Sequence, residues 1–315
     1  MPPTFYSNIA ARNETLQGFV TGFQQSTERF KASKTAPLVK VPAIKGNFPT
    51  VDISQELRLP DTAWDGAGPM KSTDLAYDDT DYQLVLNAIE ATLAQLQLPS
   101  MPPENLPQAA TRKVTKTLLL RRETRVATQM TTLTNYLSTH RDTLSVAGDK
   151  FSAGTSDPVG VAQDALAAIT LAADTEYTQI SAPLAVWQAL AKHSQLTEMV
   201  KYVDGARLDQ MGVDKIAQAL GFGRGVNLDA SWDSSNKGGT RNIQRVWGNH
   251  MIFQALDSQP AEGTSAHAVT LTLDNDLVVA DSWEPNPWST SYYAWMAELV
   301  LITNHYAGYL VRDVL

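Results

Sequence analysis

Residues 113–130 read KVTKTLLLRRETRVATQM and form the centre of the longest periodic segment of the chain. Apolar side chains recur there at spacings of three, four or eight residues, at Val114, Leu118, Val126, Met130, Leu133 and Leu137. Asn105 is a suitable N-cap, and Pro107 is tolerated in a first helical turn. The pattern predicts a helix from about Pro107 to Leu137, which would be roughly 45 Å long at 1.5 Å per residue.

The opposite face of this predicted helix is strongly basic. It carries Arg112, Lys113, Lys116, Arg121, Arg122 and Arg125. One side should therefore pack on the body of the protein, and the other should present positive charge.

The chain that precedes this helix reads as a series of projecting segments. Residues 1–45 contain four prolines and resemble an arm that cannot bury a face alone. Residues 46–86 resemble a long, polar hairpin with a DGAGP turn at 65–69. Residues 80–98, TDYQLVLNAIEATLAQLQL, read as an apolar helix that ends at Pro99.

Short helical and strand-like elements alternate after Gly154. SDPVGVAQDALAAI begins with an acidic cap and a first-turn proline, which is a strong helix start. TQISAP reads as a strand, and LAVWQALAKH, SQLTEMVKYV and VDKIAQAL read as helices. Strand-like runs follow in GVNLDASW, NIQRVWGNHMIFQAL, HAVTLTLD, DLVVADSW and ELVLITNHYAGYLVRDVL. The expected fold class is α+β.

Composition excludes several classes of protein. The 315 residues are 43% hydrophobic, no apolar run reaches the roughly 18 residues of a membrane span, and no basic-then-apolar start indicates a secretory signal. The absence of cysteine removes disulfides and thiolate metal sites, and it fits folding in a reducing cytoplasm. A net charge of −8 argues against a dedicated nucleic-acid binder.

Charge is distributed in blocks along the chain. Residues 1–45 carry six basic and two acidic side chains, and residues 105–150 carry eight and three. Residues 46–104 carry two basic and ten acidic side chains, and residues 151–315 carry nine and eighteen. Such blocks favour complementary contacts between copies or with an anionic neighbour, although chance clustering on solvated faces gives the same pattern.

No catalytic or cofactor motif is present. GFGRG at 221–225 follows a predicted helix, so we expect a helix C-cap instead of a dinucleotide loop. Scattered histidines and the acidic residues Asp78, Asp79 and Asp81, which we expect at a helix N-terminus, do not form a metal motif. Asp274–Asp276 reads as a hairpin turn. The aromatic run SWEPNPWSTSYYAW should serve a core or an interface.

The order of the predicted segments resembles that of the major capsid proteins of tailed bacteriophages, which have the Hong Kong 97 fold. The segments are an arm, a projecting hairpin, a long amphipathic helix, an α+β body and a closing strand. KVTKTLLLRRETRVATQM is similar to the family's spine-helix phrase, with Glu123 at the usual acidic position. Similar phrases are SDPVGVAQDALAAI, ISAPLAVWQALAKHSQLTEMVKYV, VDKIAQALGFGRGVNLDASWDSSNKGG, RVWGNHMIFQAL with its Trp-Gly pair, and AGYLVRDVL.

The resemblance implies a division of the chain. It would have an N-terminal arm at 1–45, an E-loop at 46–86, a peripheral domain with the spine helix at 87–150 and 280–303, and an axial domain at 151–279 and 304–315. It further implies hexamers and pentamers in an icosahedral shell around double-stranded DNA, in a virion assembled in the host cytoplasm. Portal, scaffolding and decoration proteins would be partners, and no cofactor, metal or membrane is implied.

Candidate contacts between subunits follow from the resemblance and the charge blocks. They are Trp64, Gly66 and Lys71 at the E-loop and Arg121, Arg122 and Arg125 on the spine helix, with Trp247 in the body. The acidic E-loop should lie near the basic arm and spine helix of neighbouring subunits, or the basic faces should contact packaged DNA through its phosphates.

Two alternatives remain open from the sequence. An encapsulin-like nanocompartment shell would share the fold but enclose cargo enzymes. An α+β enzyme would need a site that forms only in three dimensions, with Asp274, His267 or His305 as candidates.

Overall fold

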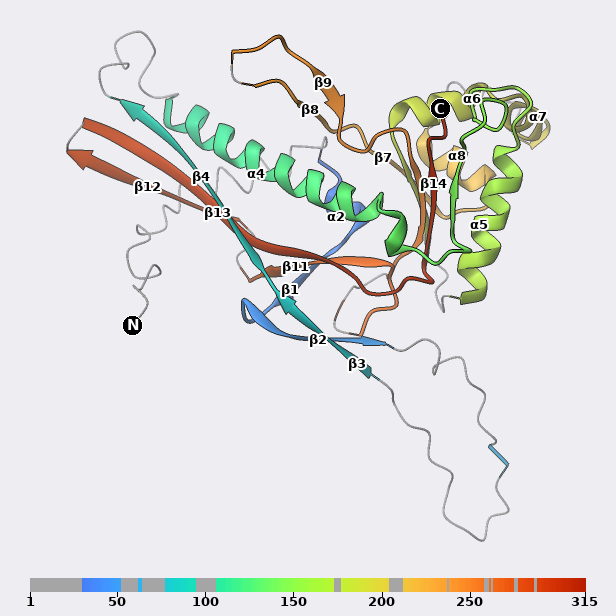
Figure 1. The fold of residues 1–315 in the computed structure, drawn as a ribbon, viewed down its shortest axis with the longest axis horizontal. Coiled ribbons are helices and arrows are strands. Elements are labelled where there is room, and N and C mark those ends of the chain that lie inside the picture. Colours follow the sequence, from blue (N-terminus) through green and yellow to red (C-terminus); the bar gives the residue numbers. More distant parts are fainter. Residues whose placement is uncertain are drawn as a thin grey trace.

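The computed structural model describes residues 30–51, 62–63, 77–94, 106–172, 177–203, 212–236, 238–257, 261, 263–274, 277–285 and 288–315. Within these residues the strands form two five-stranded sheets and two two-stranded ribbons (Figure 1). The expected arm before residue 30 and the hairpin tip with Trp64, Gly66 and Lys71 lie outside these residues. No helix within the described ranges is long and apolar enough to cross a membrane.

The first sheet is built around one long strand, β13 (Trp288–Ile302). On one edge, β11 (Ala268–Leu273) pairs with its second half and β12 (Val278–Pro285) with its first half. On the other edge, β4 (Val85–Ala94) pairs with ten of its residues. The strand β1 (Leu38–Val41) adds in parallel to β11. The described end of the expected arm is therefore part of the body.

Two sequence expectations fail in this sheet. The stretch around residues 85–94 is a strand, not a helix. Its exposure alternates, with Ile89, Ala91 and Leu93 packed on the core and Ala88 and Glu90 exposed. Ten residues of pairing with β13 therefore override a helix-like composition. The expectation that Asp274–Asp276 joins a hairpin fails as well, because the flanking strands β11 and β12 both pair with β13 and not with each other; residues 275 and 276 themselves lie outside the described ranges.

The long helix is confirmed as α4 (Leu106–Met130), about 37 Å long at 1.5 Å per residue. It lies along β4 and β13 (Figure 1), and its buried residues Val114 and Leu118 contact Tyr292 and Met296 in one cluster. The helix ends seven residues before the expected Leu137. A short 3-10 turn, η2 (Leu133–Asn135), follows. The side chains of Asn135 and Tyr136 donate to the carbonyls of Gln129 and Met130, which satisfies the last turn.

The expected hairpin is confirmed at its base, where β2 (Lys45–Val51) pairs antiparallel with β3 (Tyr77–Gln83). Phe48 and Tyr82 point inward and pack with residues of β1, β11 and β13. Asp78, Asp79 and Asp81 lie on β3 and are exposed. They therefore do not cap a helix, because the segment that follows them is strand β4.

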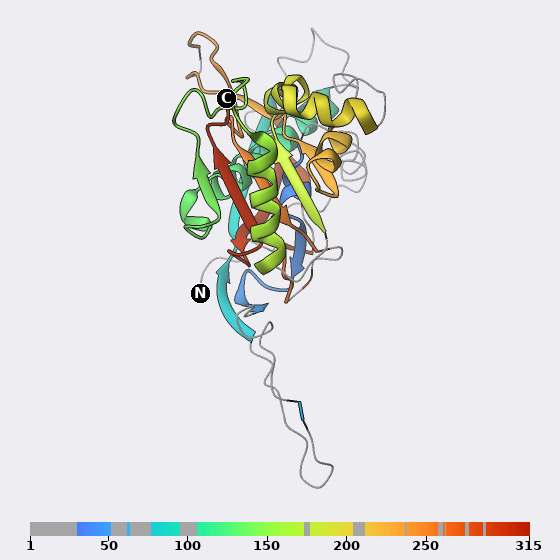
Figure 2. The same cartoon turned by 90° about the vertical axis from the view of Figure 1, so that its right-hand side faces the viewer.

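The second sheet has the order β5-β14-β10-β6-β7. Its strands are β5 (Arg141–Thr143), β6 (Thr178–Ala182), β7 (Arg224–Asn227), β10 (Met251–Ala255) and β14 (Gly308–Arg312). Helix α5 (Pro158–Ala172) lies on β10 and β14 (Figure 2), and Asp157 caps it by accepting from the Gly160 N–H. Strand β5 lies within the segment 87–150 expected for the peripheral domain but pairs in the second sheet. Strand β11 lies within the segment 151–279 expected for the axial domain but pairs in the first sheet.

Three more helices complete the second layer, α6 (Leu184–Lys192), α7 (Ser194–Val203) and α8 (Val213–Ala219). Gly221 follows α8 with a φ of 90°, which confirms that GFGRG ends a helix. Helix α2 (Ala32–Thr35), near the start of the described chain, packs against α4. The strands β8 (Ser231–Asp233) and β9 (Ile243–Arg245) form a separate ribbon.

Candidate functional site

The outward face of α4 carries the exposed part of the predicted basic stripe. Arg112, Lys113, Lys116 and Arg121 are exposed, as expected for a face that points away from the sheet. Arg122 is 5% exposed and Arg125 is half-buried, so these two side chains do not belong to the outer stripe. Of the three spine-helix residues predicted to contact other subunits, only Arg121 is available on the surface of one subunit.

Arg122 and Arg125 instead bind one buried carboxylate. The Nε of Arg122 lies 2.6 Å from Oε2 of Glu298, and Nη1 of Arg125 lies 3.3 Å from Oε1. Arg125 also donates to the side-chain oxygen of Asn87 on β4. Because the Glu298 side chain is fully buried, the two arginines neutralise a charge that β13 would otherwise hold in an apolar layer. The prediction for Arg122 is therefore corrected to a contact within the subunit.

A signal for this pairing exists in the sequence. Glu298 is a single acidic residue directly before the apolar run LVLI of β13. A lone charge in a buried strand requires a partner. Sequence alone does not reveal that the partner is on α4, 173 and 176 residues away.

Glu123 joins three parts of the chain that are distant in sequence. Its Oε1 accepts from the indole Nε1 of Trp247 at 2.6 Å, and its Oε2 accepts from the backbone N–H of Ala32 at 2.8 Å. The carboxyl is fully buried, and this burial raises its pKa to about 7 although the hydrogen bonds act in the opposite direction. Trp247 is itself buried, so this predicted contact residue also acts inside the subunit.

Three of the five histidines, His140, His267 and His305, lie near one another, because the charges of His305 and His140 act on the pKa of His267. His267 is buried, and its Nδ1 lies 2.8 Å from the Asn304 carbonyl. Burial lowers the pKa of His267 to about 4, so the ring is neutral at pH 7. His305 lies 3.0 Å from the Asn135 carbonyl. No group of three histidine or acidic side chains within the described ranges is arranged to hold a metal ion.

Of the residues named for the enzyme alternative, His267 and His305 interact electrostatically, but Asp274 does not join them. His267 directly precedes β11 and Asp274 directly follows it, so about 20 Å of extended strand separates them. A serine–histidine contact that the sequence does not reveal occurs elsewhere, with Ser156 Oγ 3.2 Å from His193 Nε2. Ser156 Oγ also donates to the Ala153 carbonyl at 2.8 Å, which fits a turn before α5 better than an activated nucleophile.

Several aromatic side chains lie on the β12–β13 hairpin. Tyr292 is buried under α4, and burial raises its pKa. Tyr293 bonds to Ser282 across the two strands, and Trp283 is 61% exposed. The hairpin therefore uses one face for the core and leaves an aromatic side chain outside.

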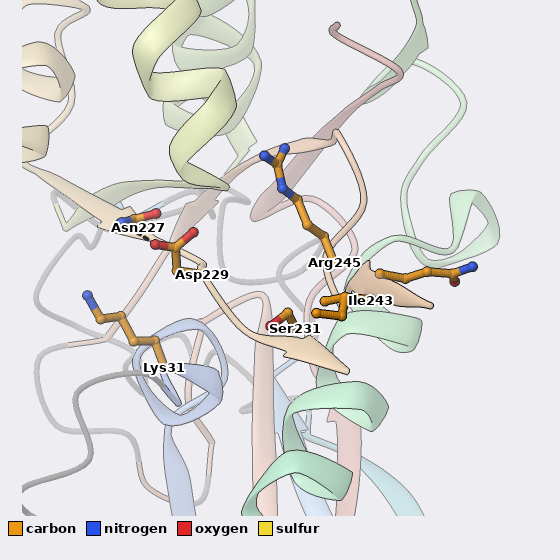
Figure 3. A pocket seen from close by; sticks show the side chains of 7 residues that line it. Lys31, Asn227, Asp229, Ser231, Ile243 and Arg245 are labelled. Carbon is orange, nitrogen blue, oxygen red and sulfur yellow. Dashed lines mark hydrogen bonds between the residues drawn. The ribbon is translucent and has the colours of Figure 1, made fainter. Parts of the chain in front are cut away.

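A surface hollow of about 570 Å³ lies between the β8–β9 ribbon and Lys31 (Figure 3). Its lining residues are Lys31, Asn227, Asp229, Ser231, Ile243, Gln244 and Arg245. Lys31 lies on the side of Asn227 and Asp229, whereas Arg245 extends away from Ser231 and Ile243. Cationic and anionic side chains of the hollow therefore do not converge on one point, as a small charged ligand would require.

Comparisons with known proteins find similarity to phage proteins. No family model matches the chain. Over 97 residues the chain is 35% identical to the major capsid protein of Burkholderia phage BcepMu, a match that spans 31% of either protein. A phage-related protein from Bordetella bronchiseptica RB50 superposes with a TM-score of 0.77 at 19% identity, covering 97% of this chain and 98% of the other. The capsid of cyanophage P-SCSP1u gives 0.59 at 12% identity, covering 88% and 86%.

The structural matches extend over both sheets, whereas the sequence match covers less than a third of the chain. The relatives named as capsids are structural proteins, not enzymes. This agreement concerns the order of helix and strand elements along the whole chain. The chain therefore has the fold of tailed-phage capsid proteins, the Hong Kong 97 fold, as the order of its segments predicts.

Proposed function

We propose that this protein is the major capsid protein of a tailed phage, which assembles into hexamers and pentamers of an icosahedral head around double-stranded DNA. The observation that carries the proposal is the match to a phage capsid over 88% of the chain, together with the stretch that is 35% identical to a phage major capsid protein. Both observations concern this fold and this sequence, and neither depends on a pocket.

Features of the described structure support a role in a shell. Among the described residues no three histidine or acidic side chains are grouped to hold a metal ion, and the charged side chains of the surface hollow do not converge. Exposed apolar side chains are found on β4, where Val85 is 50% and Leu86 is 55% exposed. Exposed apolar surface of this kind is commonly covered when identical copies associate.

The division into an arm, an E-loop, a peripheral domain and an axial domain is part of this proposal. With the expected bounds, the peripheral domain (87–150 and 280–303) would hold α4 with β13 and most of β4, and the axial domain (151–279 and 304–315) would hold α5 to α8 with β6, β7, β10 and β14. The hairpin β2–β3 would be the base of the E-loop, which carries Trp64, Gly66 and Lys71 towards a neighbour. Portal, scaffolding and decoration proteins would bind the assembled shell in the virion.

The exposed basic face of α4 would lie on the inner surface of the shell or against another subunit. Replacing Lys113, Lys116 and Arg121 by glutamate changes the charge of this face by six units without touching the buried Glu298 network. We expect assembly or DNA retention to fall at least tenfold, because phosphate contacts depend on cationic charge. The ratio of nucleic acid to protein in purified particles measures this effect. Unchanged particles would exclude both positions for the face.

Electron microscopy of the purified recombinant protein tests the central proposal. We expect closed, regular particles with icosahedral symmetry. The contents of native particles then distinguish a phage head from a nanocompartment, since the first holds genomic DNA and the second holds a cargo protein. A protein that stays monomeric at high concentration and shows a saturable activity would contradict both shell functions.

A further inference from the structure

The β8–β9 ribbon projects from the body beside α4 (Figure 1). Its two strands pair Ser231 with Arg245 and Asp233 with Ile243, and within the described chain no other strand pairs with either of them. Hydrogen bonds within the ribbon hold its turn in place. Asp233 Oδ1 accepts from the backbone N–H groups of Ser235 and Asn242, each at 3.0 Å.

The ribbon has no core of its own. Every residue of β9 is exposed, and β8 has no buried residue. Trp232 is 40% exposed on one face, and Ile243 is 55% exposed on the other, because residues of adjacent register point to opposite faces. A two-stranded ribbon of three residues per strand is at best marginally stable in water. Its preformed tip and exposed apolar side chains are typical of an element that is completed by a partner.

Charge indicates the kind of partner. Residues 231–245 carry three basic side chains, including Arg241 and Arg245, and one acidic side chain. Arg241 is 77% exposed and lies 3.9 Å from Asp233, so most of its guanidinium is available. An acidic surface with some apolar area would complement this ribbon.

The same chain offers such a surface on the β2–β3 hairpin. Phe48 and Tyr82 occupy the inner face, so Asp79 and Asp81 point outward, opposite Pro49 and Asn47 in the register. Both aspartates are exposed, and Pro49, which is paired with Asp79, is half-buried. Lys45, at the far end of β2, is the basic side chain of the described hairpin. The outward face thus combines two carboxylates and one apolar ring with Lys45 at its end, so its net charge in the described hairpin is −1.

We propose that the β8–β9 ribbon of one copy docks on the outward face of the β2–β3 hairpin of a second copy, with Arg241 and Arg245 facing Asp79 and Asp81. The inference rests on the proposed shell function and specifies one of its contacts. Every copy carries both surfaces, so the contact repeats around a ring in one-to-one ratio. A nucleic acid would pair with the arginines but would leave Ile243 unburied, so a protein surface is favoured.

Charge reversal in two parts of the chain tests the contact. Ribbon reversal is R241E with R245E, and hairpin reversal is D79R with D81R. We expect each pair alone to reduce the yield of closed particles at least tenfold, and the combination of all four to restore it to within about threefold of wild type. D79R and D81R combined with R224E, an exposed arginine on β7, serve as the mismatched control and should stay defective.

Mixing the two reversed proteins shows whether the contact is between copies. Each ribbon then meets a complementary hairpin only on the other kind of chain, so oligomers that contain both chains should form although neither forms them alone. A normal yield of closed particles from the R241E/R245E variant would overturn the contact. A variant with all four substitutions that assembles no better than either pair alone would also overturn it. Normal shells that lose only nucleic acid would assign the ribbon to nucleic acid and also overturn it. Wild-type protein that forms no particles would instead contradict the proposed function.

Discussion

Arg122 and Glu298 form the ion pair that fixes α4 to the first sheet. Arg122→Met leaves the Glu298 carboxylate buried with only the half-buried Arg125 at 3.3 Å. We expect a loss of about 3 kcal/mol in the free energy of unfolding, at the low end for a broken buried pair, because Arg125 still compensates part of the charge. Urea unfolding of the purified subunit measures the loss.

Two variants control this experiment. The double variant R122M/E298M removes both charges and should recover most of the lost stability. Arg121→Met, at the exposed neighbouring position, should change the free energy of unfolding by less than about 0.5 kcal/mol. Equal effects of R121M and R122M would contradict a specific role for the buried pair.

Glu123 should make the stability of the subunit depend on pH. Its pKa is raised from 4.5 to about 7 in the folded protein, so the protonated form is the one that folding favours. The resulting stabilisation is full below pH 4.5, declines between pH 4.5 and 7, and is absent above 7, a change of about 3 kcal/mol at 1.4 kcal/mol per unit.

Glu123→Gln isolates this contribution because the amide does not titrate. The difference in the free energy of unfolding between wild type and E123Q should shift towards E123Q by about 3 kcal/mol from pH 4.5 to 8. Buried His267, whose pKa is lowered to about 4, weakens both proteins equally as the pH falls through 6.5. Parallel curves for E123Q and for the exposed control Glu198→Gln would refute the assignment.

The sequence indicates that Glu123 matters but not what it binds. Its position in the helical phrase is visible, whereas its partners Ala32 and Trp247 lie 91 and 124 residues away. The same holds for Arg122 and Arg125, which helical periodicity places on the basic face. The helical periodicity of the sequence does not show that β13 and β4 cover this part of the helix.

Among the elements, those with local signals are predicted best. Helices α5 and α8 have a cap or a terminal glycine, and the base of the β2–β3 hairpin alternates in side-chain type. Strand β4 is the largest error. Its apolar residues Ile89, Ala91 and Leu93 follow a period of two, which is the strand signal, but alanine and leucine make the stretch helix-like. Only the pairing with β13 decides between them.

Gly225 tests how closely α8 approaches β7. A Cβ at this position would lie 2.6 Å from the carbonyl oxygen of Val213, the first residue of α8. Gly225→Ala should therefore displace the helix and cost about 1–3 kcal/mol, as overpacking does in other cores. The midpoint of thermal unfolding measures the effect. Gly154→Ala, where a Cβ has no neighbour within 4 Å, should leave the midpoint nearly unchanged. An equal shift for both would show that α8 is free to move.

At the scale of the whole molecule, assembly should depend on residues before the described body. The sequence predicts an arm there, and Ala32 and Ala36, near the start of the described chain, are already buried against α4 and the second sheet. Deleting residues 2–29 keeps this buried segment. We expect folded subunits that remain unassembled or form irregular aggregates, because contacts between neighbours are lost.

Analytical ultracentrifugation and electron microscopy distinguish these outcomes from normal particles. Unchanged unfolding of the truncated subunit by urea would show that the body is intact. Closed particles of wild-type size from the truncated protein would contradict an assembly role for the arm.

Strand β13 continues from the tip of the β12 hairpin to Ile302, and residues 303–307 then lead directly into β14 of the second sheet. The joint is filled by the ring of His267, which would lie 2.5 Å from a Cβ added at Gly308. A force on the β12–β13 hairpin is therefore transmitted through the continuous backbone of β13 to residues 303–307. There the closely packed ring of His267 restricts bending between the first and the second sheet. In the proposed shell, the two sheets of each subunit should therefore rotate together as one rigid body and should not hinge at residues 303–307.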